Sequence, residues 1–273
     1  MAGITRPALR YHGGKWKLAP WIIQHFPGHT TYVEPFGGGA SVILRKHPSF
    51  IEVYNDLNGQ VVNFFRILRE RPADLIAAID LTPYSREEFL LSQQDDIDLD
   101  ALERARRFYI WSWQGRGRAG VNEPGGWRFM SRRTRYRTPV DDFNNVDHLW
   151  GIVRRLKQVH IECDPYQKII LRYDSPETLF YLDPPYVQDT RCYRWMRDGY
   201  RFDMTDDEHR ELARVVSEIK GMAIISGYPS DLYDELFAGW TRVDRRAAKD
   251  NGIKTATECI WISPGAVVQP RLV

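Results

Sequence analysis

Cysteine is scarce in this chain of 273 residues, and Cys163, Cys192 and Cys259 lie far apart in the sequence. Their spacing fits neither a metal site nor a paired disulfide framework, which is typical of a protein from a reducing compartment. Long apolar runs are also lacking, since none approaches the ~20 residues that span a bilayer. The first residues are not typical of a signal peptide. The sequence therefore predicts a soluble, cytoplasmic protein without a membrane partner.

A large net charge is lacking as well, because 38 basic side chains are balanced by 36 acidic ones. The charges are nevertheless unevenly distributed. Residues 86–103 contain seven acids and one base, whereas residues 104–137 contain ten arginines, one acid and seven aromatic residues. Arginine can bind phosphates and guanine edges, and aromatic rings can stack on bases, so the second segment is a candidate DNA surface. The seven histidines show no metal-ligand spacing, and no metal site is predicted.

Seven short stretches are typical of buried strands, and helical patterns lie between several of them. Residues 205–208 have capping-box spacing, and residues 58–69 form a second amphipathic candidate. This alternation predicts an α/β fold with a mostly parallel seven-stranded sheet covered on both faces. The turn-forming residues 250–252 predict an antiparallel last pair. The expected strands are 31–36, 50–55, 159–164, 179–183, 222–226, 241–245 and 258–262.

The segment from residue 68 to residue 145 breaks this rhythm and is interpreted as an inserted lobe. Its aromatic residues Tyr109, Trp111 and Trp113 are expected to form a small core, which is the simplest structural explanation for them. Its arginines are expected to supply the DNA-facing side, with Arg10 as a further candidate beside Tyr11. The arginines of the lobe chosen for that side are Arg116, Arg118, Arg132, Arg133, Arg135 and Arg137.

Asp183-Pro184-Pro185-Tyr186 follows the apolar run 178–182 and is the most informative motif. Two prolines end the strand and stiffen the backbone, so Asp183 is held at the carboxyl end of a strand. In open α/β sheets, that edge is where ligands bind. A carboxylate, a free carbonyl oxygen on Pro184 and the ring of Tyr186 suit the recognition of an amino group on a planar heterocycle.

A glycine-rich turn, Gly37-Gly38-Gly39, follows the expected strand 31–36 and precedes an expected helix start at Ala40-Ser41. Glycine lets the backbone approach a ligand closely, and a helix N-terminus can bind an anion. The anion could be a dinucleotide pyrophosphate or the carboxylate of S-adenosylmethionine, although the G-x-G-x-x-G fingerprint is absent. Asp56 closes the next strand, where a carboxylate can bind ribose hydroxyls.

Gly13-Gly14-Lys15 precedes a helical stretch at residues 16–24. Such a turn can place an ammonium group beside a carboxylate or phosphate. Taken alone, Lys15 is better explained as an ordinary solvated lysine at the start of a helix.

Together these segments resemble the Dam-like class of adenine-N6 DNA methyltransferases, which use S-adenosylmethionine. The matching residues are 9–15, 33–41, 55–57 and 180–186, with further matches at 225–228, 257–258 and 260–261. They occur in the order of that class, with the recognition lobe between the glycine turn and the Asp183 segment. The resemblance implies a Rossmann-like methyltransferase fold, with a catalytic domain at residues 1–67 and 146–273 and a mainly helical DNA-recognition lobe at residues 68–145.

The resemblance also implies roles for individual residues. Asp183 and the Pro184 carbonyl would accept hydrogen bonds from the target 6-amino group, Pro185 would keep the turn stiff, and Tyr186 would stack on an adenine flipped out of the duplex. Transfer would be a direct in-line displacement that depends on positioning and charge. The residues that would surround S-adenosylmethionine are Tyr11, Lys15, Glu34, Phe36, Gly37, Gly39, Ser41, Asp56, Leu57, Tyr166 and Asp183.

Other functions share parts of this pattern. The same grip suits the 4-amino group of cytosine, and a methyltransferase of RNA or of a protein amide would use the same cofactor. A DNA-binding protein that has lost catalysis is a further alternative, which the intact Asp183 segment and glycine turn disfavour. The preferred hypothesis is a site-specific adenine-N6 methyltransferase of double-stranded DNA. It is expected to be a monomer, with a cognate restriction enzyme as a candidate partner.

Overall fold

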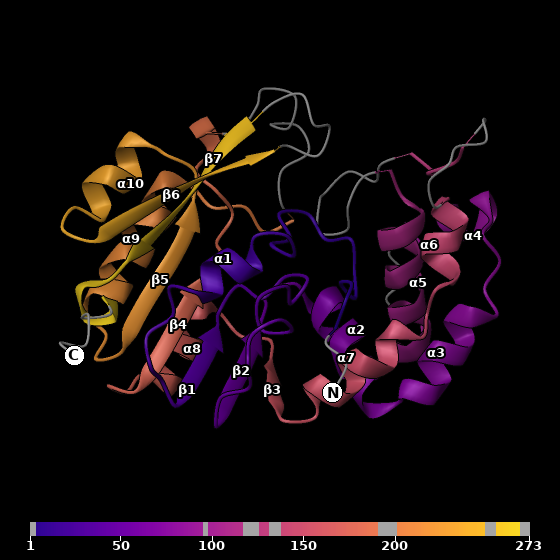
Figure 1. Cartoon of the computed structure of the whole chain (residues 1–273). Helices are drawn as coiled ribbons and strands as arrows, with labels where there is room; N and C mark the ends of the chain where they lie inside the picture. Colours follow the sequence, from indigo (N-terminus) through magenta and orange to yellow (C-terminus); the bar gives the residue numbers. More distant parts are fainter. Residues whose placement is uncertain are drawn as a thin grey trace.

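The computed structural model describes residues 4–94, 98–116, 126–130, 138–190, 201–248 and 255–267 (Figure 1). Within these ranges, seven strands form one sheet in the order β3-β2-β1-β4-β5-β7-β6. The strands β1 to β5 pair in parallel, whereas β7 runs antiparallel to both β5 and β6. This is the mostly parallel sheet with an antiparallel last pair that the sequence predicts. The strands are β1 (Thr31–Glu34), β2 (Ile51–Asn55), β3 (Val159–Glu162), β4 (Thr178–Leu182), β5 (Met222–Gly227), β6 (Thr241–Ala248) and β7 (Thr255–Ile262).

Helices cover both faces of the sheet, and further helices lie beyond its β3 edge (Figure 1). None of the helices in the described ranges is long and apolar enough to cross a membrane. On the sheet they include α1 (Ala19–Ile23), α2 (Gly59–Glu70), α7 (His148–Leu156), α8 (Tyr166–Tyr173), α9 (Asp206–Ser217) and α10 (Asp231–Leu236). Farther out lie α3 (Pro72–Asp80), α4 (Arg86–Leu91), α5 (Ala101–Gln114) and α6 (Pro139–Asn144). The described ranges also contain two short 3₁₀ helices, η1 (Gln188–Thr190) and η3 (Pro264–Ala266).

The central strands are buried on both faces, because successive side chains of a strand point to opposite sides of the sheet. Residues packed with α1, α2 and α7 include Tyr32, Tyr54, Leu179, Tyr181 and Ile224. Residues packed with α8, α9 and α10 include Val33, Val53, Phe180, Leu182 and Ile225. The continuous apolar character of these strands in the sequence is the consequence of this double burial.

The helix caps that the sequence indicates are formed in the structure. Thr205 and Glu208 form the expected capping box at the start of α9, with bonds in both directions. Asn58 caps α2 by accepting a hydrogen bond from the backbone N–H of Gln60, and α2 occupies almost the range expected for it. The helix expected at residues 16–24 is shorter, since α1 begins at Ala19 and residues 16–18 form turns.

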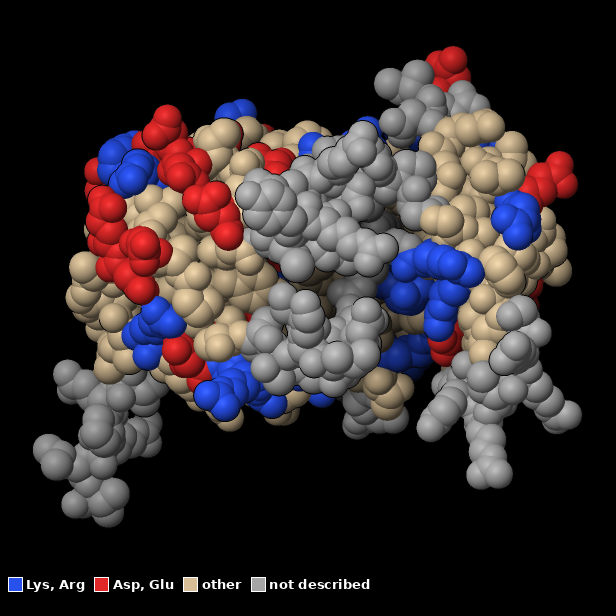
Figure 2. All heavy atoms as spheres, turned by 90° about the horizontal axis from the view of Figure 1, so that it is seen from above, with Lys and Arg blue, Asp and Glu red and all other residues tan. Residues whose placement is uncertain are grey.

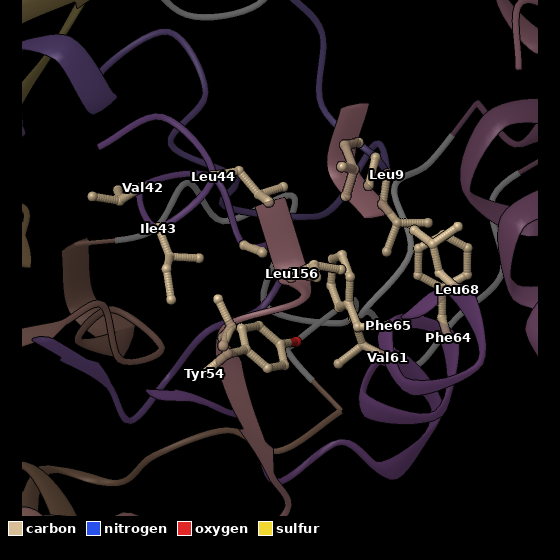
Figure 3. Close-up of a cluster of buried hydrophobic side chains, with 14 of the residues drawn as sticks. Leu9, Val42, Ile43, Leu44, Tyr54, Val61, Phe64, Phe65, Leu68 and Leu156 are labelled. Carbon is tan, nitrogen blue, oxygen red and sulfur yellow. The ribbon is translucent and has the colours of Figure 1, made fainter. Parts of the chain in front are cut away.

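The helices beyond β3 share their buried core with the sheet. Figure 3 shows part of one cluster, which joins the N-terminal segment, residues 42–44, β2, α2 and α7. The same cluster includes Tyr109 and Trp113 of α5, which are buried, with Trp111 partly buried against it. These three aromatic residues therefore have the core role expected of them. The division between a catalytic domain and a lobe at residues 68–145 stays a prediction.

A buried ionic group ties three segments together behind the sheet edge. Glu52 on β2 is 1% exposed and binds the ammonium of Lys46, whose Nζ lies 2.6 Å from Oε1. Arg155 on α7 binds both oxygens of Glu52, and its Nη2 also donates to the backbone oxygen of Ile43 at 2.7 Å. The carboxylate of Glu52 and its two cations thus join β2, α7 and residues 43–46.

Replacement of Glu52 by Gln should lower the free energy of unfolding by about 3–5 kcal/mol, because it leaves two buried cations without their anion. Urea denaturation of the two proteins measures this difference. The matched control is Glu235→Gln, which breaks the exposed ion pair with Arg210 and should cost less than about 1 kcal/mol. Losses of similar, small size in both variants would show that the buried group does not stabilise the fold.

Candidate active site

The candidate site lies where the parallel strands β1, β2 and β4 end. A cavity of about 280 Å³ is located there, close to the lower end of the range for small-molecule pockets. Figure 2 views the molecule from above and shows acidic side chains gathered on the α9 and α10 side, and basic ones on the side of α4 and α5. The structure brings all of the expected cofactor residues to the wall of this cavity: Tyr11, Lys15, Glu34, Phe36, Gly37, Gly39, Ser41, Asp56, Leu57, Tyr166 and Asp183.

The glycine turn is packed tightly against β2. A Cβ atom on Gly37 would lie 2.3 Å from Cε2 of Tyr54, and Gly38 has a φ of +46°. The backbone N–H of Gly37 donates to the oxygen of Asn55 at 2.7 Å, and the hydroxyl of Tyr54 donates to the oxygen of Gly38 at 2.7 Å. Glycine is needed here because the ring of Tyr54 fills the space that a side chain would take. This packing fixes the floor of the cavity.

Asp56 holds the same turn in place. Its Oδ2 accepts a hydrogen bond from the backbone N–H of Gly38 at 2.8 Å, and its Oδ1 accepts one from the N–H of Asn58 at 2.8 Å. Burial raises the pKa of Asp56 to about 6, although both hydrogen bonds oppose this shift. Asp56 thus joins β2 to the glycine turn, a role that the sequence analysis did not anticipate, and it also faces the cavity.

The helix expected to start at Ala40-Ser41 is absent, and that expectation was wrong. Residues 41–46 are described, and they form turns. Ala40 has a positive φ of 56°, which a right-handed helix does not accommodate. Val42 and Ile43 are β-branched and buried, and Pro48 limits the segment soon afterwards. The helix whose N-terminus was expected to bind an anion is therefore not formed by residues 41–46.

Asp183 and Lys15 form an ion pair at the centre of the site. Nζ of Lys15 lies 3.0 Å from Oδ1 of Asp183, with the two side chains 6% and 18% exposed. Nζ also donates to the backbone oxygen of Gly13 at 2.7 Å, which closes the N-terminal turn. The carboxylate neighbour expected for Lys15 is confirmed, and the explanation as a solvated lysine is wrong.

Burial sets the protonation of this pair. Burial raises the pKa of Asp183, and the charge and hydrogen bond of Lys15 offset the rise only in part. For Lys15, burial lowers the pKa, but the charges of Asp183 and Glu258 outweigh burial and raise it. The ammonium group is thus kept charged inside the protein by two carboxylates.

Tyr186 is held on three sides. Its hydroxyl donates to Oε2 of Glu258 at 3.0 Å, and its ring meets that of Tyr228 edge-on, with centroids 4.6 Å apart and an angle of 79°. Nζ of Lys15 lies 4.7 Å from the centroid of the Tyr186 ring. Neither Glu258 nor Tyr228 was predicted as a site residue. Their only signal in the sequence was their place in the segments 225–228 and 257–258 that resemble the Dam-like class.

Glu34 ends β1 beneath the same cavity. It is 2% exposed, and its Oε1 accepts a hydrogen bond from the hydroxyl of Tyr32 at 2.7 Å. Burial raises the pKa of Glu34 to about 8, a shift that the bond from Tyr32 opposes. Glu34 is therefore mainly protonated at neutral pH in the empty site.

Aromatic residues form the opposite end of the cavity. The rings of Phe36 and Tyr166 are tilted at 34° with centroids 5.2 Å apart. Leu57 is half exposed beside them, and Ser41 is buried in the wall. The sequence analysis missed the far wall, which consists of residues 201–204 with Glu208 and Glu211 of α9. Residues 201–204 belong to no motif, and the capping box at residues 205–208 indicates only the start of a helix. The packing of α9 brings Glu208 and Glu211 to the site.

The expected DNA-facing arginines are only partly within the described residues. Arg10 donates to the backbone oxygen of Gly115 through Nη1 at 3.0 Å, so it ties the N-terminal segment to the end of α5. Arg116 is exposed, with its guanidinium 4.9 Å from the ring centroid of Phe129. Arg86 lies over Trp127 at 4.8 Å and was not predicted. Arg118, Arg132, Arg133, Arg135 and Arg137 lie outside the described residues.

Comparison with known proteins gives one consistent result. The model of the D12 class N6 adenine-specific DNA methyltransferase family matches residues 11–249. The type II methyltransferase M.MjaIII of Methanocaldococcus jannaschii is 24% identical over 264 residues, covering 86% of this chain and 89% of that protein. The type II methyltransferase M1.LlaDCHI of Lactococcus lactis is 24% identical and covers 92% and 91%. The DNA adenine methylase of Escherichia coli is 27% identical over 195 residues, covering 67% and 66%.

The raised pKa of Glu34 should make stability depend on pH. The folded protein keeps a proton on Glu34 up to a pH of about 8, whereas the unfolded chain releases it near its ordinary pKa of 4.5. Stability from this group is therefore complete below that lower value and is lost as pH rises, by up to about 1.4 kcal/mol per pH unit. The raised pKa of Asp56, about 6, makes stability fall with pH mainly below pH 6. Between pH 6 and 8, Glu34→Gln should therefore flatten the remaining decline of stability with pH.

Urea denaturation of the ligand-free protein at pH 6, 7 and 8 measures this effect. The contributions of groups that the substitution does not touch cancel in the difference between wild type and Glu34→Gln. Parallel pH profiles for the two proteins would show that Glu34 is ionised in the folded state.

Proposed function

We propose that this chain, which belongs to the D12 class N6 adenine-specific DNA methyltransferase family, uses S-adenosylmethionine to methylate adenine in double-stranded DNA at the site around Asp183. Membership of the family makes the chain an adenine-specific DNA methyltransferase, which disfavours the alternative of a cytosine methyltransferase. The cofactor, the flipping of the target base and the roles of single residues are the proposed parts.

The observation that carries the proposal is the ammonium of Lys15 on Asp183. A nitrogen that donates hydrogen bonds lies 3.0 Å from Oδ1 and 4.7 Å from the centre of the Tyr186 ring. An adenine stacked on Tyr186 would place its own amino nitrogen in a similar position, as a hydrogen-bond donor to the same carboxylate. Lys15 therefore marks the place of the target amino group, and it has to move aside when the base enters.

The cavity beside Asp183 fits S-adenosylmethionine by its chemistry. Asp56 and Asp183 give it negative charge that suits a ligand with an ammonium and a sulfonium group, and Glu34 adds hydrogen-bonding oxygens. Phe36 and Tyr166 offer aromatic faces for an adenine ring. When bound, the cofactor supplies a methyl group on a positively charged sulfur. The residues that would hold the cofactor beside Asp183 are those that line this cavity.

Asp183 and Pro184 act on the target nitrogen. The carboxylate and the free carbonyl oxygen accept the two amino hydrogens, which draws electron density onto the nitrogen and aims its lone pair at the methyl carbon. The bound cofactor would supply the methyl group to this nitrogen, and the methylated nitrogen would then lose a proton. The raised pKa of Asp183 suits it to accept this proton. Pro184 and Pro185 keep the turn stiff, which preserves the geometry.

The target base has to leave the duplex to reach Asp183, because the carboxylate is only 18% exposed and lies in the wall of the cavity. We propose that the arginines chosen for the DNA-facing side bind the DNA backbone while Tyr186 stacks on the extruded base; in the lobe these are Arg116, Arg118, Arg132, Arg133, Arg135 and Arg137. Relatives named as type II methyltransferases support a cognate restriction enzyme as a partner. A monomer stays the proposed state.

Methyl transfer from labelled S-adenosylmethionine to mixed-sequence duplex DNA, followed by nucleoside mass spectrometry, tests the function. The expected product is N6-methyladenine within one short sequence. Asp183→Asn should reduce kcat at least ~100-fold while the dissociation constant of the cofactor changes little. The amide oxygen of asparagine still accepts a hydrogen bond, but it cannot take up the proton that the amino group loses. The control Asp80→Asn alters an exposed residue of α3 and should behave as wild type. Normal turnover by Asp183→Asn would refute the assigned role.

Arginine contacts to DNA should appear in the salt dependence of binding. Alanine at Arg132, Arg133, Arg135 and Arg137 together should weaken DNA binding and reduce the slope of log K against log salt by about 1 for each arginine that contacts a phosphate. Fluorescence anisotropy at several salt concentrations measures the slope. Alanine at Arg210 and Arg214 of α9 serves as the control, and an equal loss of slope there would place the DNA surface elsewhere.

A further inference from the structure

We propose that Glu258 is a positioning residue for methyl transfer, because it fixes the ring of Tyr186 by accepting a hydrogen bond from its hydroxyl group. The inference rests on the proposed function of the Asp183 site and adds a residue from the other end of the sheet. Glu258 is 72 residues away from Tyr186 in sequence, and their contact is a hydrogen bond of 3.0 Å.

The antiparallel strand β7 explains how Glu258 reaches the site. Ser226 pairs with Ile260 and Gly227 pairs with Cys259, so Glu258 follows at the level where the chain leaves β5 toward Tyr228. Because β7 runs opposite to β5, its first residues lie at the edge where the parallel strands end. The reversed last pair of the sheet thus brings a side chain of β7 to the edge that carries Asp183.

The ring of Tyr186 needs such a contact. Two prolines stiffen the backbone before it, but they leave the side-chain torsions of tyrosine free to rotate. The edge-on contact with Tyr228 supports one side of the ring, and Glu258 holds the far end through the hydroxyl. With the hydroxyl and one edge fixed, the face that carries Lys15 keeps one orientation. A base that replaces the ammonium then stacks at a defined angle to Asp183.

Glu258 could alternatively act through its charge alone, since it raises the pKa of both Lys15 and Asp183. Glutamine separates the two explanations. Its side-chain oxygen still accepts a hydrogen bond from Tyr186, whereas the negative charge is lost. Leucine removes both, and Tyr186→Phe removes the hydroxyl while the aromatic ring stays.

The experiment compares the single-turnover rates of methyl transfer by the variants and the wild type. The substrate is an unmethylated duplex that contains the DNA sequence methylated by the wild-type protein. Glu258→Leu and Tyr186→Phe should each lower the rate of transfer about 10-fold, with dissociation constants for DNA and S-adenosylmethionine within about 2-fold of wild type. Glu258→Gln should retain the rate within about 3-fold. The double variant Tyr186→Phe with Glu258→Leu should be no slower than Tyr186→Phe, because loss of the hydroxyl already removes the bond to Glu258.

A matched hydrogen bond lies away from the cavity, where the hydroxyl of Tyr173 donates to Glu162 at 2.8 Å. Glu162→Leu and Tyr173→Phe should therefore lower stability without slowing transfer. An unchanged rate in Tyr186→Phe, or a rate in Glu258→Gln as low as in Glu258→Leu, would overturn the proposal. Tyr186→Phe keeps the test valid even if Glu258→Leu fails to fold. Wild-type protein that forms no N6-methyladenine would instead refute the proposed function.

Discussion

The ion pair between Lys15 and Asp183 is the contact on which the rest of the site depends. It joins the N-terminal turn to the end of β4, two segments that are far apart in sequence. Burial makes a lone carboxylate or ammonium costly at this position, so each group requires the other. The same burial raises the pKa of Asp183. The proposed function gives this carboxylate the hydrogen bonds from the target amino group, so the ion pair links the stability of the site to its proposed chemistry.

The surroundings of this pair are fixed by packing rather than by the ligand. Tyr54 excludes any side chain at Gly37, and Asp56 holds the backbone of Gly38, so the floor of the cavity exists before a cofactor arrives. Behind it, Glu52 joins β2 to α7 and to residues 43–46. Preformed geometry of this kind spares the protein the entropy cost of ordering the site on binding. The shape of the site is therefore fixed by packing at the edge of the sheet and by the buried charged groups there.

Much of the fold could be predicted because strands and caps are local signals. The apolar runs placed all seven strands, the Thr205 capping box placed α9, and the two prolines placed Asp183 at a strand end. Glu258 was not predicted as a site residue, because its contact with Tyr186 depends on the register between β5 and β7. The helix after the glycine turn was wrongly predicted, because Ala40 has a positive φ, a conformation that an alanine in the sequence does not indicate.

The most direct test of this account is a crystal structure of the protein with a duplex that contains its target sequence and a non-reactive analogue of S-adenosylmethionine. The account predicts that the 6-amino nitrogen of an extruded adenine lies within hydrogen-bond distance of Asp183, stacked on Tyr186, with the ammonium of Lys15 displaced. If the target base were bound while Lys15 remained on Asp183, the central claim that the ammonium marks the place of the amino group would be contradicted.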